Sequence, residues 1–317
     1  MKGYHIYIPN YSVGADCYKE IPWVTRKYGK KAVVIGGKTA MDKVKNALLD
    51  GIDGSELEIT DFVWYGGEAS YENVEMLIET EAVKNADMIF AVGGGRVMDT
   101  CKVVRERLDK PMFTFPTLGS NCAATTSIAV IYHPDGSVNN YFYGKIPAEH
   151  IFINTKIIAE SPEHMFWAGI GDAISKELEA QLAIRGHKAD HTPLMGNQLS
   201  LICIDPLIEY GKKAYEDCKN NTESFELEQV VLDIIITTGM VSNFMTTEND
   251  YYYNSSLAHG FYNGTSVIPN CIHNHQHGEI VSFGSLVLLT YDKNYDECDR
   301  IMKFHKEMGL PLTMSDI

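Results

Sequence analysis

Short apolar runs alternate with longer amphipathic stretches in the first half of the chain, and this alternation restricts the fold more than any other feature. Each run is rich in β-branched or aromatic residues, which is typical of a strand. The predicted strands are 32–35, 62–64, 88–92, 112–115, 129–132 and 151–153, and the predicted helices between them are 39–50, 71–84 and 98–108. Strands that alternate with helices pair in parallel, so the sequence predicts an α/β fold with a doubly wound, mainly parallel sheet. The Asp135-Gly136 pair between Tyr132 and Val138 predicts one hairpin turn.

The second half of the chain is predicted to be helical. Ser161-Pro162-Glu163 combines a good N-cap, a residue suited to the first turn and an acid that complements the helix dipole. The predicted helices that follow are 165–182, 194–214, 223–243 and 280–289. We therefore predict two domains, 1–160 and 161–317. The residues before Ile317 are typical of a loop that leads into another element, so we expect the helical domain to be truncated at its C-terminus.

Composition excludes several classes of function. The chain has 317 residues and a formal net charge of −15, which argues against binding to nucleic acid or to anionic membranes. Its seven cysteines are scattered, with no CxxC pair, as is typical of reduced thiols in a cytoplasmic protein. The sequence shows no signal peptide after Met1 and no apolar run near the ~20 residues that a membrane span requires.

A triple glycine, Gly93-Gly94-Gly95, follows the predicted strand 88–92. Glycine lets the backbone approach a ligand closely, and the amides that open the next helix attract phosphate. The alternative is a tight strand–helix turn without a ligand. Asp99 and Lys102 follow within two turns, where the plain interpretation is a pair of solvated polar residues.

Two further loops lie at the carboxyl ends of predicted strands. Thr117-Leu118-Gly119-Ser120 offers small hydroxyl groups that can bind a ribose, a phosphate or a nicotinamide amide, although a plain loop is the simpler alternative. Gly37 and Lys38 stand where nicotinamide enzymes often carry an acid that binds the adenosine ribose. An acid would repel a 2′-phosphate, whereas glycine and lysine would not. Here the alternative is a turn with a surface lysine.

Asp172, His259 and His277 are the candidate metal ligands. A carboxylate and two imidazoles are the donors of a metal site with one open position, and an open position permits chemistry at the metal. The plain alternatives are a structural His259 and a polar loop in which His273, His275 and His277 alternate. Glu177 and Glu179, on the predicted helix of Asp172, are interpreted as a solvated face.

Together, these segments resemble the iron-containing (group III) alcohol dehydrogenase superfamily, and most of all its glycerol dehydrogenase branch. The resemblance covers nearly the whole chain, with the motifs in the expected order. Its motifs are Gly66-Gly67-Glu68-Ala69-Ser70, Gly93-Gly94-Gly95-Arg96-Val97-Met98-Asp99-Thr100, Pro116-Thr117-Leu118-Gly119-Ser120, Ala129-Val130-Ile131-Tyr132, Ala168-Gly169-Ile170-Gly171-Asp172-Ala173, Leu257-Ala258-His259 with Asn263-Gly264, and His277-Gly278-Glu279 with Phe283-Gly284.

The resemblance implies a Rossmann-like dinucleotide-binding domain and an all-helical, metal-binding domain of the dehydroquinate synthase-like type. Asp172, His259 and His277 would ligate zinc, and iron is less favoured because Lys176 stands where iron-binding relatives place a fourth histidine. Superfamily members are usually homo-oligomers. The residues that would hold NAD or NADP are Gly37, Lys38, Gly93, Gly94, Gly95, Arg96, Asp99, Thr117, Leu118, Ser120, Thr126, Ile128 and Tyr132.

The chain also departs from the branch at several positions. Cys122 replaces an aspartate that contacts the polyol in glycerol dehydrogenases, so Cys122 is the candidate substrate contact and glycerol is disfavoured as the substrate. Gly37 replaces the usual acid, which leaves NAD and NADP both open. Arg96 keeps the charge of a usual lysine, and Tyr262 replaces a histidine of a His-x-x-His pair.

The function implied is a metal-dependent, NAD(P)-dependent alcohol or polyol dehydrogenase that acts on a small alcohol or ketone. Three alternatives stay open. One is a glycerol-1-phosphate dehydrogenase-like enzyme, in which Lys176 would contact the phosphate. The others are a lyase of the dehydroquinate synthase type and a non-enzymatic nucleotide or metal sensor.

Overall fold

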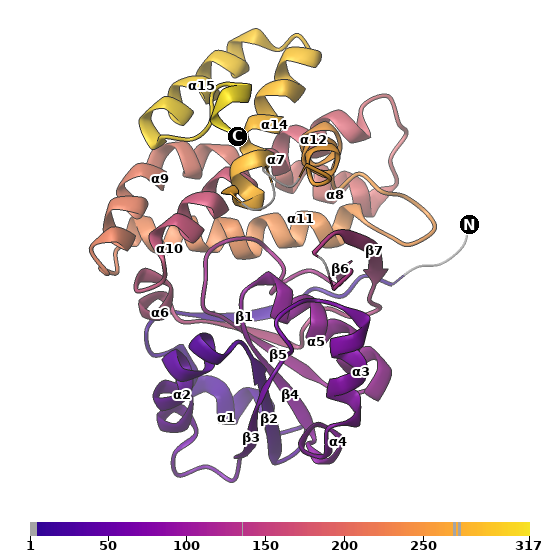
Figure 1. The fold of residues 1–317 in the computed structure, drawn as a ribbon, viewed down its shortest axis with the longest axis vertical. Coiled ribbons are helices and arrows are strands. Elements are labelled where there is room, and N and C mark those ends of the chain that lie inside the picture. The colour runs from indigo at the N-terminus through magenta and orange to yellow at the C-terminus, as the bar shows by residue number, and fades with distance from the viewer. Residues whose placement is uncertain (1–4, 135, 269–270, 272–273) are drawn as a thin grey trace. The chain divides into compact units, whose positions relative to one another are not determined.

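The computed structural model describes residues 5–134, 136–268, 271 and 274–317 (Figure 1). Contacts divide the chain into two units. The first comprises Met1–Leu118 with Ala123–Glu160, and the second comprises Gly119–Cys122 with Ser161–Ile317. The short segment Gly119–Cys122 thus groups with the helical half, although it is flanked on both sides by the α/β half.

A six-stranded parallel sheet forms the centre of the first unit, with the order β1-β8-β5-β4-β2-β3. Its strands are β1 (Asn10–Val13), β2 (Lys31–Gly36), β3 (Glu58–Trp64), β4 (Met88–Gly93), β5 (Met112–Pro116) and β8 (His150–Ile153). The central strands β4 and β5 are buried along their whole length, which explains their continuous apolar sequences. The predicted parallel α/β sheet is therefore confirmed.

Helices cover both faces of this sheet (Figure 1). On one side lie α1 (Ile21–Thr25) and α2 (Lys38–Ile52), and on the other lie α3 (Tyr71–Glu79), α4 (Glu81–Asn85) and α5 (Gly95–Leu108). The apolar residues Val44 and Leu48 of α2 pack on aromatic side chains of the strands, among them Phe90 and Phe115. The predicted helix 71–84 is divided at Thr80, whose backbone is extended. A short helix, α6 (Thr155–Ala159), ends the unit.

The predicted strand 129–132 does not join the parallel sheet. It forms β6 (Ile128–Tyr132), which pairs antiparallel with β7 (Val138–Tyr143) in a two-stranded sheet of its own. This pairing agrees with the hairpin predicted between Tyr132 and Val138. Of the predicted turn pair, Asp135 lies outside the described residues, and Gly136 has a φ of 87° that suits glycine.

The second unit is built of helices. They are α7 (Glu163–Ile184), α8 (His191–Ser200), α9 (Ile204–Lys219), α10 (Phe225–Leu232), a π-helical turn (Asp233–Thr237), α11 (Thr238–Met245), α12 (Leu257–Thr265), α14 (His277–Tyr291) and α15 (Tyr295–Met308). Two of the predicted helices are interrupted in the structure. The predicted helix 194–214 is two helices separated by a turn, and a π-helical turn interrupts the predicted helix 223–243. Helices α12 and α15 were not predicted.

The structure bears on the membrane-spanning helices and on the cysteines that the sequence analysis considered. Within the described part of the chain, no helix combines the length and the apolar character needed to cross a bilayer. All seven cysteines lie among the described residues, and none of them forms a disulfide bond.

His305 gives the second unit a pH-dependent stability. The ring is fully buried at the end of α15, and its Nδ1 donates to the Pro311 carbonyl at 2.9 Å. Burial lowers the pKa of His305 to about 4, so below about pH 6.5 the unfolded chain binds a proton that the folded chain does not.

Stability should therefore fall as pH falls from about 6.5 to about 4. The free energy of unfolding, measured in urea titrations, should fall between about pH 7.5 and about pH 4.5. For His305→Gln this fall should be about 2 kcal/mol smaller than for the wild type. The exposed His191→Gln is the control and should follow the wild type. Parallel curves for His305→Gln and the wild type would contradict the expectation.

Candidate functional site

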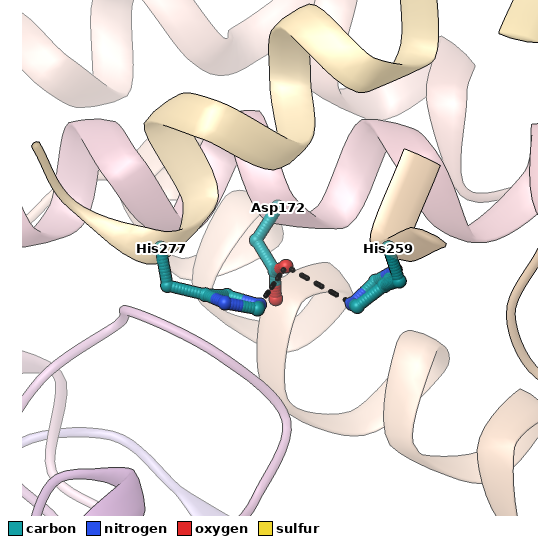
Figure 2. A group of neighbouring side chains, drawn as sticks. All are labelled: Asp172, His259 and His277. Carbon is teal, nitrogen blue, oxygen red and sulfur yellow. Dashed lines mark ion pairs between the residues drawn. The ribbon is translucent and has the colours of Figure 1, made fainter. Parts of the chain in front are cut away.

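Asp172, His259 and His277 come from three helices of the second unit and converge (Figure 2). Asp172 lies on α7, His259 on α12, and His277 is the first residue of α14. Asp172 Oδ1 is 3.2 Å from His277 Nε2 and 3.7 Å from His259 Nε2. Figure 2 shows the carboxylate between the two imidazoles. The structure therefore brings together the three ligands predicted from the sequence.

Glycines allow these helices to approach closely enough. A Cβ on Gly278 would lie 2.0 Å from the Ala168 carbonyl oxygen, so α14 contacts the α7 backbone directly. A Cβ on Gly284 would lie 2.6 Å from the carbonyl oxygen of Ala258, which precedes His259. Since real Cβ atoms do not approach that closely, both positions require glycine. The spacing of the candidate ligands thus depends on backbone-to-backbone packing at these two contacts.

The three side chains fit a divalent metal ion. A tetrahedral zinc ion with bonds of ~2.0–2.2 Å separates its ligand atoms by about 3.4 Å, close to the two distances here. The Oδ1 atom of Asp172 is buried, and beyond its ion-pair contacts with the two imidazoles it has no hydrogen-bond partner among the residues that the structure describes. Burial would raise the pKa of Asp172, but the two imidazoles and the Lys176 ammonium outweigh burial and lower it. An ionised carboxylate whose buried oxygen has only two imidazole nitrogens as close polar neighbours is what a metal ligand requires.

Glu179 is a site residue that the sequence interpretation missed. The predicted solvated face of Glu177 and Glu179 was wrong, because other helices surround α7 along this stretch. Glu179 is fully buried, and its Oε2 accepts from Nδ1 of His259. Burial would raise the pKa of Glu179, but the His259 imidazole outweighs it and lowers the pKa. Glu177 is half-buried, accepts from the backbone N–H of Ile204, and has a pKa raised by burial to about 7.

Helix spacing could have identified Glu179. Residues 172, 176 and 179 are one and two turns apart, so they share one face of α7. In sequence, Lys176 lies between the two carboxylates. Its side chain is buried, and its Nζ donates to Asn254 Oδ1 at 2.7 Å and to the Asn254 carbonyl at 3.1 Å. The face therefore carries a candidate ligand, a buried cation and a buried acid in order.

Of the two alternating histidines that the structure describes, His275 and His277, it is His277 that reaches Asp172. His275 Nδ1 lies 3.0 Å from Glu279 Oε1, and Glu279 also accepts from the Gln276 backbone N–H. His273 lies outside the described residues. Tyr262 packs edge-on against His277, with ring centroids 4.2 Å apart.

The glycine-rich turn and two other predicted loops share one edge of the parallel sheet. β5, β4 and β2 are neighbours, so the segments after their carboxyl ends lie side by side. Gly93 ends β4 with a φ of 145°, a conformation that favours glycine, and Gly94 is the N-cap of α5. Gly95 opens α5, and the N-cap Gly94 offers no side-chain acceptor to the amides of its first turn at this edge. Thr117 is buried, and its N–H donates to the Gly93 carbonyl.

The other predicted nucleotide residues occupy the same unit, with one exception. Leu118 lies near Gly94, since a Cβ there would meet Leu118 Cδ1 at 3.0 Å. Gly37 is the N-cap of α2, and the Nζ of Lys38 lies 4.6 Å from the centre of the Trp64 ring. The exception is Ser120, which belongs with Cys122 to the segment that groups with the helical unit.

Asp99 and Lys102 are not solvated, so the plain interpretation of these two residues was wrong. Both are buried, and Lys102 Nζ donates to Asp99 Oδ1, to Thr126 Oγ1 and to the Ile128 carbonyl. Asp99 Oδ2 accepts from the N–H of Val130. This network attaches β6 to α5, while cofactor contact by Asp99, Thr126 and Ile128 stays a prediction.

Arg96 and Tyr132 extend the same region. The Arg96 guanidinium is 3.2 Å from Glu68 Oε2 and lies 5.9 Å from the centre of the Tyr132 ring. The Tyr132 backbone N–H donates to the Ala69 carbonyl. The motifs around residues 66–70, 93–100 and 129–132 are therefore in contact, although their roles in binding stay predictions.

Known proteins share both the sequence and the fold. A profile of the iron-containing alcohol dehydrogenase family matches residues 9–152. The glycerol dehydrogenase of Thermotoga maritima is 30% identical over 261 residues, which cover 80% of this chain and 68% of the relative. Glycerol dehydrogenase 1 of Schizosaccharomyces pombe is 28% identical over 302 residues, which cover 93% of this chain and 64% of the relative's own length.

A solved structure agrees with these sequence matches. The crystal structure of glycerol dehydrogenase from Schizosaccharomyces pombe matches with a TM-score of 0.88 and 26% identity, covering 99% of this chain and 79% of that one. The match to the Thermotoga maritima enzyme, at 30% identity over 68% of its length, agrees with the family profile. The chain therefore belongs to the iron-containing alcohol dehydrogenase family of oxidoreductases.

Proposed function

We propose that the protein is a metal-dependent oxidoreductase that transfers hydride between NAD(P) and the carbonyl carbon of a small hydroxy-carbonyl compound. The observation that carries the proposal is the convergence of Asp172, His259 and His277, whose ligand atoms meet at a buried carboxylate oxygen. The family and the glycine-rich edge of the parallel sheet support the nicotinamide cofactor.

A zinc ion held there would supply a Lewis acid for the oxygen of the carbonyl or alcohol group. The chain's own part is to hold the donors and to bind the cofactor. Asp172 is half-buried and brings a negative charge whose Oδ1 atom is shielded from solvent, and the glycine contacts of α14 fix the distance to the imidazoles. At the other site, the first amides of α5 would bind the cofactor's phosphates, since Gly94 has no side chain to cap them.

Two residues bear on the substrate. Cys122 replaces an acid that the glycerol dehydrogenase resemblance assigns to polyol contact, so we propose a substrate with fewer hydroxyl groups than glycerol. Lys176 gives no support to the phosphorylated alternative, because its ammonium is buried and donates to both oxygens of Asn254. Assembly as a homo-oligomer, which the resemblance implies, stays part of the proposal.

The test is reductase activity of the zinc-loaded protein with NADH and with NADPH. The panel contains dihydroxyacetone, dihydroxyacetone phosphate and several small aldehydes. Oxidation of either cofactor with an unphosphorylated substrate supports the proposal. Activity confined to the phosphorylated ketone would select the glycerol-1-phosphate alternative, and binding of zinc and nucleotide without turnover would overturn the proposal.

The end of β2 gives a prediction about cofactor choice. No acid follows β2, where Gly37 and Lys38 stand, so we expect the 2′-phosphate of NADPH to be accepted. Gly37→Asp should reduce kcat/KM for NADPH relative to NADH by at least about tenfold, or ~1.4 kcal/mol, because the new carboxylate repels the phosphate and binds the ribose. Gly37→Asn adds similar bulk without charge and is the control. An unchanged ratio in Gly37→Asp would contradict this assignment.

A further inference from the structure

We propose that Glu179 is a positioning residue that fixes the tautomer of His259 and, with the same carboxylate, holds the start of helix α12. The inference rests on the metal site proposed above. It concerns a residue that touches neither the proposed substrate nor the proposed cofactor.

The contacts of Glu179 divide between its two oxygens. Oε2 accepts from the ring Nδ1 of His259. Oε1 accepts from the backbone N–H of Ser256 at 2.8 Å and from the backbone N–H of His259 at 2.9 Å. The side chain is fully buried, so these contacts replace the hydration of a carboxylate. One carboxylate therefore binds both the ring and the backbone of the same residue.

The contact with the ring decides where its proton lies. An ionised carboxylate can only accept hydrogen bonds, so the Nδ1 atom of His259 must carry the proton. The other ring nitrogen, Nε2, then carries a lone pair in the neutral ring. Nε2 is the atom 3.7 Å from Asp172 Oδ1, on the side where a metal would bind. A carboxylate behind a ligating histidine commonly fixes its tautomer and orientation in this way.

The contact with the backbone decides where the helix begins. Ser256 is the N-cap of α12, and His259 lies in its first turn, where backbone N–H groups have no partner within the helix. The Ser256 hydroxyl donates to the backbone carbonyl of Glu179 at 3.5 Å. Oε1 thus provides the acceptor for two amides and places negative charge at the positive end of α12.

Lys176 anchors the chain just before this helix. It lies one turn before Glu179 on α7, and its ammonium holds Asn254, two residues before Ser256. Both α12 and the residues that lead into it are therefore attached to the helix that carries Asp172. The position of His259 relative to Asp172 is set by α7 itself.

Glu179→Gln separates the two roles. The glutamine carbonyl can still accept from the two amides, but its NH₂ group faces Nδ1 and can only donate. The ring must then place its proton on Nε2, which blocks the proposed ligand atom. We expect a 10–100-fold weaker zinc affinity, read by competition with a chelator, with little change in the thermal midpoint. The visible spectrum of the Co²⁺-loaded protein should change as well. Glu177→Gln, on the same helix, is the matched control and should bind zinc as the wild type does.

A double-mutant cycle tests whether Glu179 acts through His259. The loss of zinc affinity caused by Glu179→Gln should vanish in a His259→Ala background, because no ring is left to orient. An equal loss with and without His259→Ala would overturn the proposal, as would an unchanged zinc affinity in a folded Glu179→Gln variant. Should that variant fail to fold, Glu179→Asp in the same cycle decides. The shorter side chain of aspartate lengthens the hydrogen bond from the His259 ring. The resulting loss of zinc affinity should again vanish in the His259→Ala background.

The same measurements distinguish this inference from the proposed function. A wild-type protein that binds no zinc would refute the metal site itself. If the wild type binds zinc and Glu179→Gln binds it with the same affinity, the metal site stands and only the role of Glu179 is refuted.

Discussion

Replacing Asp172 by asparagine is expected to reduce kcat/KM of the zinc-loaded protein by about 10³-fold or more. Asparagine keeps the size of the side chain but removes the negative charge that lies between the two imidazoles. Zinc affinity should fall in parallel, because an amide is a poor ligand for zinc next to neutral imidazoles. The measurement is initial rate with the best substrate of the panel, together with a zinc titration.

Asp205→Asn is the matched control for this variant. Asp205 lies in the same unit, is 74% exposed and forms a surface ion pair with Arg300, which is worth about 1 kcal/mol at most. It should leave both turnover and zinc affinity unchanged. If Asp172→Asn bound zinc and turned over at the wild-type rate, the three residues would not be the metal site.

Gly278→Ala is expected to damage both stability and metal binding. The new Cβ would lie 2.0 Å from the Ala168 carbonyl oxygen and 2.9 Å from Asp172 Cβ, so helices α7 and α14 must separate. Overpacking of this kind costs ~1–3 kcal/mol or more, and backbone atoms cannot rotate away as a side chain could. Because His277 is adjacent in α14, its distance to Asp172 should increase and zinc affinity should fall. Chemical denaturation and a zinc titration measure the two effects.

Gly264→Ala provides the comparison. Gly264 lies in α12, and a Cβ there would meet no atom of the described residues within 4 Å. Alanine in an open helical position stabilises by ~0.5–1 kcal/mol relative to glycine. The two substitutions are chemically identical, so opposite signs in their free energies of unfolding isolate the helix contact. A Gly278→Ala protein as stable as the wild type would show that α7 and α14 have room to separate at no cost.

Patterns local in sequence were sufficient for much of the fold. The strands β2, β4 and β5 are mainly apolar because both faces are buried over nearly their whole length, and such runs are visible without a structure. The boundaries within the helical half were less predictable. The predicted helix 194–214 is interrupted by a turn around residue 202, and the predicted helix 223–243 contains a π-helical turn. Apolar periodicity continues through both interruptions, so it does not report them.

The candidate metal ligands were predicted from residue types and from the family resemblance, and the structure brings all three together. Glu179 was missed for a physical reason. On α7 alone, an acid two turns after Asp172 is typical of a solvated face. Its burial depends on α12, which is eighty residues away in sequence and was not predicted as a helix.

The sequence by itself determined the parallel α/β sheet, the helical second half and the identity of the candidate ligands, because each depends on local periodicity or on residue type. Only the tertiary structure decided the surroundings of those ligands. The close contacts of Gly278 and Gly284, the grouping of Gly119–Cys122 with the helical unit, and the contacts of Glu179 all join segments distant in sequence. Whether a carboxylate is solvated or orients a histidine depends on what packs against it, and packing between distant segments leaves no local pattern.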